Sequence, residues 1–165
     1  MKDARFVTME NIVPLVSPAD VTTSATATAF VDMKNALHAT FFAFFGSITS
    51  TSADQAVVVT MECATAAASG SEVAIAFSYR LSGAVAANTW GAITAATSSG
   101  VSVGTTDDDK ILAVDINPAA LEGALADARF VRMVITPDAG ASATEVAAWA
   151  VLDPRYPQLT HKSAT

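Results

Sequence analysis

The chain has 165 residues, of which 52% are hydrophobic, a length typical of one domain with its own core. Its 9 Lys and Arg residues stand against 16 Asp and Glu residues, for a formal net charge of −7. That sign repels phosphate backbones and no Lys/Arg stripe offsets it, so we expect no nucleic-acid binding. The most apolar run, residues 39–45, is far shorter than the roughly 18 residues that a membrane-spanning helix needs, so we expect no membrane partner.

The low charge content is the first indication of assembly. A soluble domain is typically about 25% charged, whereas this chain has 15%. A free monomer generally needs charge to keep its surface from associating. Because the membrane alternative fails, we expect a protein that hides much of its surface against other protein subunits. Residues 1–11 lack the apolar core of a signal peptide, so we expect assembly in a cytoplasm rather than secretion.

The first 25 residues differ from the middle of the chain. They include Pro14 and Pro18 and end in a Thr/Ser/Ala run. We expect residues 1–25 to form an extended N-terminal arm, which is either a frayed terminus or a segment laid on a neighbouring subunit.

From residue 26 onward, apolar side chains mostly recur at every second position, which is the period of a β-strand. Residues 72–80 show it most clearly, with Val73, Ile75, Phe77 and Tyr79 on one face. The alternation predicts eight strands, at residues 26–31, 37–45, 55–63, 72–80, 88–97, 110–116, 129–136 and 144–152.

One short helix is expected between two of these strands, at residues 117–122. Asn117 can cap its N-terminus, Pro118 suits the first helical position, and Gly123 can end it. Segments rich in Ser, Thr, Gly and Asp separate the strands, at residues 46–54, 66–71, 98–109 and 137–143.

This pattern predicts the fold class and the domain limits. Eight short strands with such turns indicate an all-β fold, a two-sheet antiparallel β-sandwich or jelly roll over residues 26–152, with at most one short helix. Pro154 and Pro157 favour extended backbone, so residues 153–165 are expected to form an extended C-terminal tail.

The strand predicted at residues 37–45 is apolar on both faces. Phe42 and Phe44 fall on one face, and Leu37, Phe41 and Phe45 on the other. In an antiparallel sandwich one face normally meets water, and leaving a Phe side chain exposed forgoes about 2–3 kcal/mol. We therefore expect both faces to be covered, either by a loop or N-terminal arm of the same chain or by another subunit. The low charge favours the subunit, so all four Phe residues are predicted to lie in a subunit interface.

Side chains that could carry catalysis or hold a metal are few and scattered. His38 lies in the apolar strand and His161 in the tail, so no paired-histidine metal site is suggested. Cys63, the one cysteine, is expected to be a buried and inert thiol. Residues 105–109 offer carboxylates to calcium but lack the spacing of a calcium loop, and are more typical of a solvated turn. No nucleophile elbow or phosphate-binding loop is present, so we expect no enzyme, no metal and no cofactor.

Several segments together resemble the small decoration, or cement, proteins of tailed-bacteriophage heads. The likeness extends over residues 28–157, and the segments that carry it are residues 31–35, 38–41, 59–65, 77–80, 130–132 and 153–157. It implies a β-sandwich or jelly-roll subunit, most often a homotrimer. Such a subunit sits on the outer surface of the capsid, where it bridges neighbouring major capsid proteins.

The resemblance also implies partners, a location and contact residues. The partners would be the major capsid protein and further copies of the chain, and the location would be the outer surface of the virion after assembly in a host cytoplasm. Decoration proteins commonly use terminal arms to reach adjacent subunits. The expected capsid-contacting arm residues are Arg5, Phe6, Val7, Arg155 and Tyr156.

Two alternatives stay open. An accessory β-sandwich of a phage tail or fibre would recognise host glycans through an exposed aromatic platform. Trp149 and Tyr79 lie in predicted strands, where core packing is the more ordinary role, whereas Trp90 beside Gly91 could serve as such a platform. A hydrolase or isomerase on a metal-binding jelly-roll barrel would need several His residues in strands, which the chain lacks.

Overall fold

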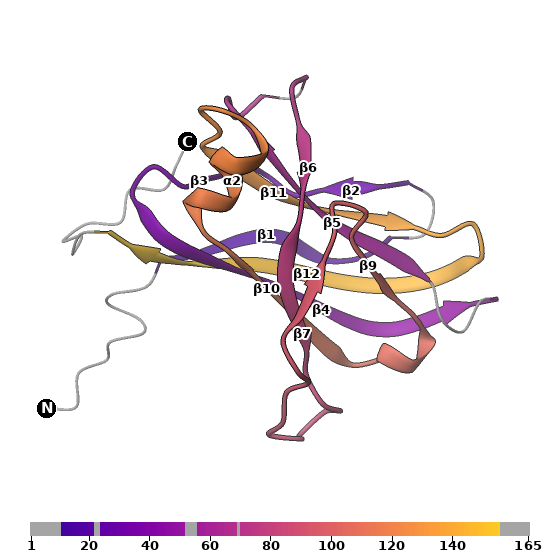
Figure 1. The fold of residues 1–165 in the computed structure, drawn as a ribbon. Coiled ribbons are helices and arrows are strands. Elements are labelled where there is room, and N and C mark those ends of the chain that lie inside the picture. The colour runs from indigo at the N-terminus through magenta and orange to yellow at the C-terminus, as the bar shows by residue number, and fades with distance from the viewer. Residues whose placement is uncertain (1–10, 22–23, 52–55, 69, 156–165) are drawn as a thin grey trace, which may run out of the picture.

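Alternating side chains organise the chain into two antiparallel sheets that face each other across a shared core (Figure 1). The computed structural model describes residues 11–21, 24–51, 56–68 and 70–155. Within these residues the structure has one short α-helix and one 3-10 turn besides its strands. The prediction of an all-β sandwich is therefore confirmed.

The first sheet, sheet A, is built around two long central strands. β4 (Ala36–Ser50) and β12 (Ala141–Pro154) pair along almost their whole length, interrupted by register shifts. In spatial order the six strands are β1 (Asn11–Asp20), β12, β4, β10 (Lys110–Ile116), β7 (Phe77–Leu81) and β8 (Thr94–Ala96). Figure 1 shows β4 and β12 running in opposite directions along the length of the molecule.

The second sheet, sheet B, has β11 (Phe130–Pro137) and β5 (Val57–Ala64) at its centre. Short strands flank this pair. They are β2 (Thr26–Ala27) and β3 (Val31–Asp32) on β11, and β6 (Val73–Ile75) and β9 (Val101–Val103) on β5.

The predicted strand at residues 72–80 is two strands that belong to different sheets. β6 pairs with β5 in sheet B, and β7 pairs with β10 in sheet A. The chain changes sheets at the exposed Ala76, while Ile75 and Phe77 on either side are buried. A continuous alternation therefore spans a corner of the sandwich, which periodicity alone does not reveal.

The N-terminal stretch enters the sandwich earlier than predicted. Residues 11–20 of the expected arm form β1, an edge strand paired with β12. Pro14 and Pro18 are compatible with this position because an edge strand does not need every backbone N–H for pairing. The sheet thus begins by Asn11 instead of residue 26, and residues 1–10 lie outside the described part.

The C-terminal boundary also moves. β12 continues through Pro154, and the backbone N–H of Arg155 donates to the carbonyl oxygen of Asn35 at 2.7 Å. The first residues of the predicted tail are therefore part of sheet A, and residues 156–165 lie outside the described part. β4 likewise runs on to Ser50 through the predicted turn, and its Ile48 is buried.

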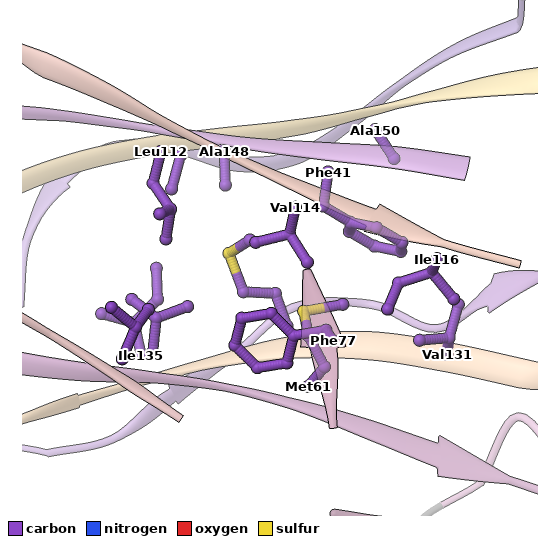
Figure 2. Packing of buried hydrophobic residues seen from close by; sticks show 14 of the residues in the cluster. Phe41, Met61, Phe77, Leu112, Val114, Ile116, Val131, Ile135, Ala148 and Ala150 are labelled. Atoms are coloured by element: carbon purple, nitrogen blue, oxygen red, sulfur yellow. The ribbon is translucent and has the colours of Figure 1, made fainter. Parts of the chain in front are cut away.

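The side chains between the sheets form one continuous core (Figure 2). Its largest fully buried members are Phe41, Phe45, Met61, Ile75, Leu112, Ile116, Leu121, Met133 and Ile135. Cys63 is buried as predicted, and burial raises the pKa of its thiol, which keeps the thiol protonated.

The helix covers one end of the core. It is α2 (Pro118–Ala124), and Leu121 is its buried anchor. As predicted, the side chain of Asn117 caps it, accepting a hydrogen bond from the N–H of Ala120 at 2.9 Å. The 3-10 turn, η1 (Thr105–Asp107), joins β9 to β10.

Candidate functional site

The four phenylalanines of β4 separate into two pairs. Phe41 and Phe45 are 0% exposed and point into the core. The interface prediction is therefore corrected for these two residues, since the chain's own sheets already bury them. Phe42 and Phe44 alternate with them and point to the outer face of sheet A, where each is half-buried.

Phe42 belongs to a row of directly paired residues that crosses five strands of sheet A. The row consists of Pro14, Trp149, Phe42, Ala113 and Arg80. The rings of Phe42 and Trp149 stack at a centroid distance of 5.5 Å. Trp149 was expected in the core, but it lies on the outer face because the smaller Ala148 and Ala150 take the inward positions of β12.

A second row lies beside the first, with Phe44 between Ala147 and Ile111. On the other side, Ile12 is opposite Val151, and Ile12 is exposed. We call the following residues the outer apolar face: Ile12, Pro14, Phe42, Phe44, Ile111, Trp149 and Val151.

A groove of about 290 Å³ lies at one edge of the outer apolar face. The connection between β7 and β8 folds back beside β4 and β10 to form it, and its principal lining residues are Phe44, Val85, Thr89, Trp90, Asp109 and Ile111. Trp90 is 39% exposed. The guanidinium of Arg80 lies 4.6 Å from the centroid of its ring and so fixes the ring's position.

Backbone and hydroxyl contacts hold this connection in place. The N–H of Gly83 donates to the carbonyl of Thr89 at 2.9 Å, and the N–H of Gly91 donates to the carbonyl of Leu81 at 2.8 Å. The hydroxyl of Ser82 accepts the N–H of Ile111 at 2.9 Å. The groove wall is therefore tied to β10 and β7.

The outer face of sheet B is different in kind. Arg132 forms ion pairs with Glu62 at 2.8 Å and with Glu72 at 2.9 Å, and its guanidinium lies over the ring of Phe30. The backbone N–H of Gly70 donates to Glu72 and is the main cause of a lowered pKa of that carboxyl. The charges of Arg132, Glu62 and Glu72 are therefore paired with one another on this face.

A further ion pair lies at the end of sheet B. Arg129 forms two hydrogen bonds with Asp32, one of them from Nε at 2.6 Å. These bonds are the largest influence on Asp32 and lower the pKa of its carboxyl. The outer face of sheet B is therefore polar and internally paired, whereas that of sheet A carries the outer apolar face beside polar residues such as Thr40, whose hydroxyl donates to Asp115 at 3.0 Å.

Residues considered for chemistry have structural partners instead. Asp107 pairs with Lys110 at 2.9 Å, and Asp108 accepts the N–H of Ile48 at 2.9 Å, so both carboxylates hold the turn before β10. His38 lies on β4, 4.0 Å from Asp115. Within the described ranges, no three His, Cys, Asp or Glu residues are grouped to hold a metal ion. His161 lies outside them.

Most of the predicted arm residues cannot be placed. Arg5, Phe6, Val7 and Tyr156 lie outside the described residues, and Arg155 is exposed at the end of β12. In the part of the chain that the structure covers, no helix has the length and hydropathy needed to cross a membrane. Comparisons with protein-family models, curated proteins and solved structures find no match to this chain.

Proposed function

We propose that the protein is a structural subunit that binds other protein subunits through the outer apolar face of sheet A. In its particular form, the proposal is a decoration protein on the outer surface of a tailed-bacteriophage capsid, where an oligomer, expected to be a trimer, stabilises contacts between major capsid proteins. The observation that carries the proposal is the contrast between the two outer faces of the sandwich.

The contrast supports binding to protein on physical grounds. Aromatic and aliphatic side chains gathered on one surface mark interaction sites, and aromatic residues are enriched at the buried centres of interfaces. The row from Pro14 to Ala113 places two large rings, Phe42 and Trp149, at the middle of such a surface. A net charge of −7 suits the outside of a capsid rather than a surface facing DNA.

The proposed action needs no chemical step. A subunit that binds an expanded capsid lattice but not its precursor stabilises the expanded state by mass action. Each bound oligomer would add its own binding free energy to the contacts among major capsid proteins.

Solution mass and capsid binding test the proposal. Light scattering coupled to size exclusion should give an oligomer, with three copies as the expected number. The purified protein should also sediment with emptied, expanded phage capsids that lack their decoration protein. A protein that stays monomeric and does not sediment with any such capsid would contradict the proposal.

A glycan-binding sandwich of a phage tail or fibre is the second candidate, and the exposed ring of Trp90 in the groove favours it. An aromatic ring can stack on the apolar face of a sugar, and Asp109 could accept hydroxyl hydrogen bonds. Binding on a glycan array that Trp90→Ala abolishes and Trp90→Phe retains would support this candidate.

A further inference from the structure

The beginning of β4 forms a corner that combines an exposed apolar side chain with positive charge. Leu37 is 51% exposed. Lys34, in the turn before β4, and Arg155, at the end of β12, are exposed too. The hydrogen bond between the backbones of Arg155 and Asn35 holds these two segments together. We call Lys34, Leu37 and Arg155 the basic corner.

The two cations of the basic corner differ from the others that the structure describes. Arg129 and Arg132 are paired with carboxylates, as is Lys110, and Arg80 lies against Trp90. Lys34 and Arg155 form no ion pair or ring contact with any described residue. Asp32, the carboxylate nearest to Lys34 in sequence, is bonded to Arg129. The charge of Lys34 still acts on Asp32, since it is one of the smaller causes that lower the pKa of that carboxyl. Both cations are exposed and lack a direct ion pair among the described residues, so a partner can reach them.

The groove carries the opposite charge. Asp109 lines it, and the backbone N–H of Asp109 faces the carbonyl of Gly46 at 3.4 Å. The side chain of Glu145 lies beside the same glycine, with its carboxylate 3.1 Å from where a Cβ would stand. Both carboxylates are exposed, and neither has a hydrogen bond or ion pair with the residues described. The groove is thus a mainly apolar recess lined by Asp109, and Glu145 lies outside that lining, on the other side of Gly46 from Asp109.

The basic corner lies at the start of β4, and the groove lies beside the middle of that strand. Leu37 and Phe44 are seven residues apart, which corresponds to about 23 Å along a strand. In Figure 1, β4 begins where β12 ends and runs towards the side of the molecule that carries η1. A single molecule cannot bring its own corner to its own groove, whereas two copies arranged head to tail can.

We propose that the basic corner of one copy docks in the groove of a second copy. Leu37 would contact Phe44, Trp90 and Ile111, while Lys34 and Arg155 would face Asp109 and Glu145. A contact between two different patches is heterologous, and it closes into a ring when the rotation between copies permits. The inference rests on the proposed function, which supplies the association of copies. It adds which two surfaces are in contact.

The lining of the groove favours a protein segment over a sugar. Phe44, Val85 and Ile111 give it aliphatic and aromatic walls, and Asp109 is the charged residue that lines it. An apolar side chain beside cations complements such a recess, and the basic corner exposes that combination among the residues that the structure describes. The polar side chains that a glycan would meet are Asp109, Thr89 and Ser82, and the hydroxyl of Ser82 is already bonded to the backbones of Ile111 and Gly83.

Charge reversal tests the contact directly. One variant carries Lys34→Glu and Arg155→Glu, and the other carries Asp109→Lys and Glu145→Lys. At physiological ionic strength each should weaken self-association by about tenfold or more, measured by sedimentation equilibrium. A chain with all four changes should regain most of the affinity. A mixture of the two double variants should also associate, because the acidic corner of one complements the basic groove of the other.

A neutral pair of variants covers the case in which a charge-reversed chain does not fold. Leu37→Ser should weaken association, whereas Ile93→Ser should not, although Ile93 is 71% exposed and neither belongs to the basic corner nor lines the groove. Circular dichroism and melting temperature establish that each variant is folded.

The outcomes separate the two proposals. If Leu37→Ser and both charge reversals leave assembly intact while Phe42→Ser and Phe44→Ser disrupt it, the corner-to-groove contact is wrong and the proposed function stands. If Trp90→Ala abolishes glycan binding with assembly unchanged, the groove serves glycans and the inference is overturned. A wild-type chain that is monomeric at every concentration overturns the inference. If it also fails to sediment with capsids, the proposed function falls with it.

Discussion

Phe42 and Trp149 are directly paired across β4 and β12, and their rings stack with centroids 5.5 Å apart and planes inclined by 16°. Stacked aromatic pairs contribute about 0.5–1.5 kcal/mol beyond the area they bury. This pair lies on the outer face, outside the core between the sheets. Two large aromatic side chains are therefore stacked on the outer face of sheet A, where each is half-buried.

Replacing Phe42 and Phe44 together by Ser should weaken oligomerisation more than it weakens the fold. Both side chains are half-buried, so we expect the free energy of unfolding to fall by about 1–3 kcal/mol. Light scattering gives the mass of the variant, and urea unfolding gives its stability. An oligomer of unchanged mass and affinity that merely unfolds earlier would show that these residues only support the chain's own packing.

Phe41→Ala should weaken the fold more than it weakens oligomerisation. Phe41 is fully buried between the sheets, and removing a core Phe side chain costs about 3–5 kcal/mol. We expect a large drop in the urea midpoint and no change in oligomer mass under conditions where the variant remains folded. Phe41→Leu, which removes less volume, should lose less stability. Loss of assembly in a fully folded Phe41→Ala chain would contradict the assignment of this residue to the core.

Much of the fold could be predicted because the period of two is strong where one face of a strand is buried. Residues 110–116 form a strand with the predicted bounds, and Asn117 caps the helix as predicted. Both features depend only on residues that are close together in the sequence. The corner at Ala76 could not be predicted from the sequence, because the alternation of apolar residues continues where the chain passes from one sheet to the other. The pairing of β1 with β12 could not be predicted either, because it joins residues that are far apart in the sequence.

The candidate site could be predicted only in part from the sequence. The composition of β4 shows that both faces are apolar, but it does not show which Phe pair points inward. That choice depends on β12, where Ala148 and Ala150 leave room between the sheets for Phe41. The same alternation puts Trp149 outside. The pair Ala148 and Ala150 within residues 144–152 is the sequence signal for this orientation, since large core side chains need small neighbours.

Two glycines should respond in opposite ways to replacement by Ala. Gly100 has a φ of +86°, and a Cβ there would collide with the carbonyl oxygen of Val59. Gly100→Ala should therefore lower the free energy of unfolding by about 1–3 kcal/mol or more. Gly123 lies in α2 with nothing within 4 Å of a Cβ, and Gly123→Ala should raise it by about 0.5–1 kcal/mol. Urea unfolding measures both, and equal losses would contradict the geometry assigned to each.

The ion pair of Asp32 and Arg129 should make stability depend on acid pH. The hydrogen bonds from Arg129 lower the pKa of Asp32 in the folded protein below its ordinary value of 3.8, so folding favours the charged carboxylate. Stability from this pair is therefore fully present above the unfolded-state pKa and is lost as the pH falls through the folded-state pKa. The side chain of Arg129 is 43% exposed, so salt should reduce the effect.

Asp32→Asn isolates this contribution. The difference in urea midpoint between the natural chain and the variant should be largest above about pH 5 and should shrink as the pH falls below about 4. The same difference should be smaller at high salt. Glu122→Gln serves as the control, because Glu122 is exposed on α2 and has no ion pair among the described residues. If the natural chain and Asp32→Asn keep a constant separation down to the lowest pH at which both fold, Arg129 does not stabilise the ionised form of Asp32.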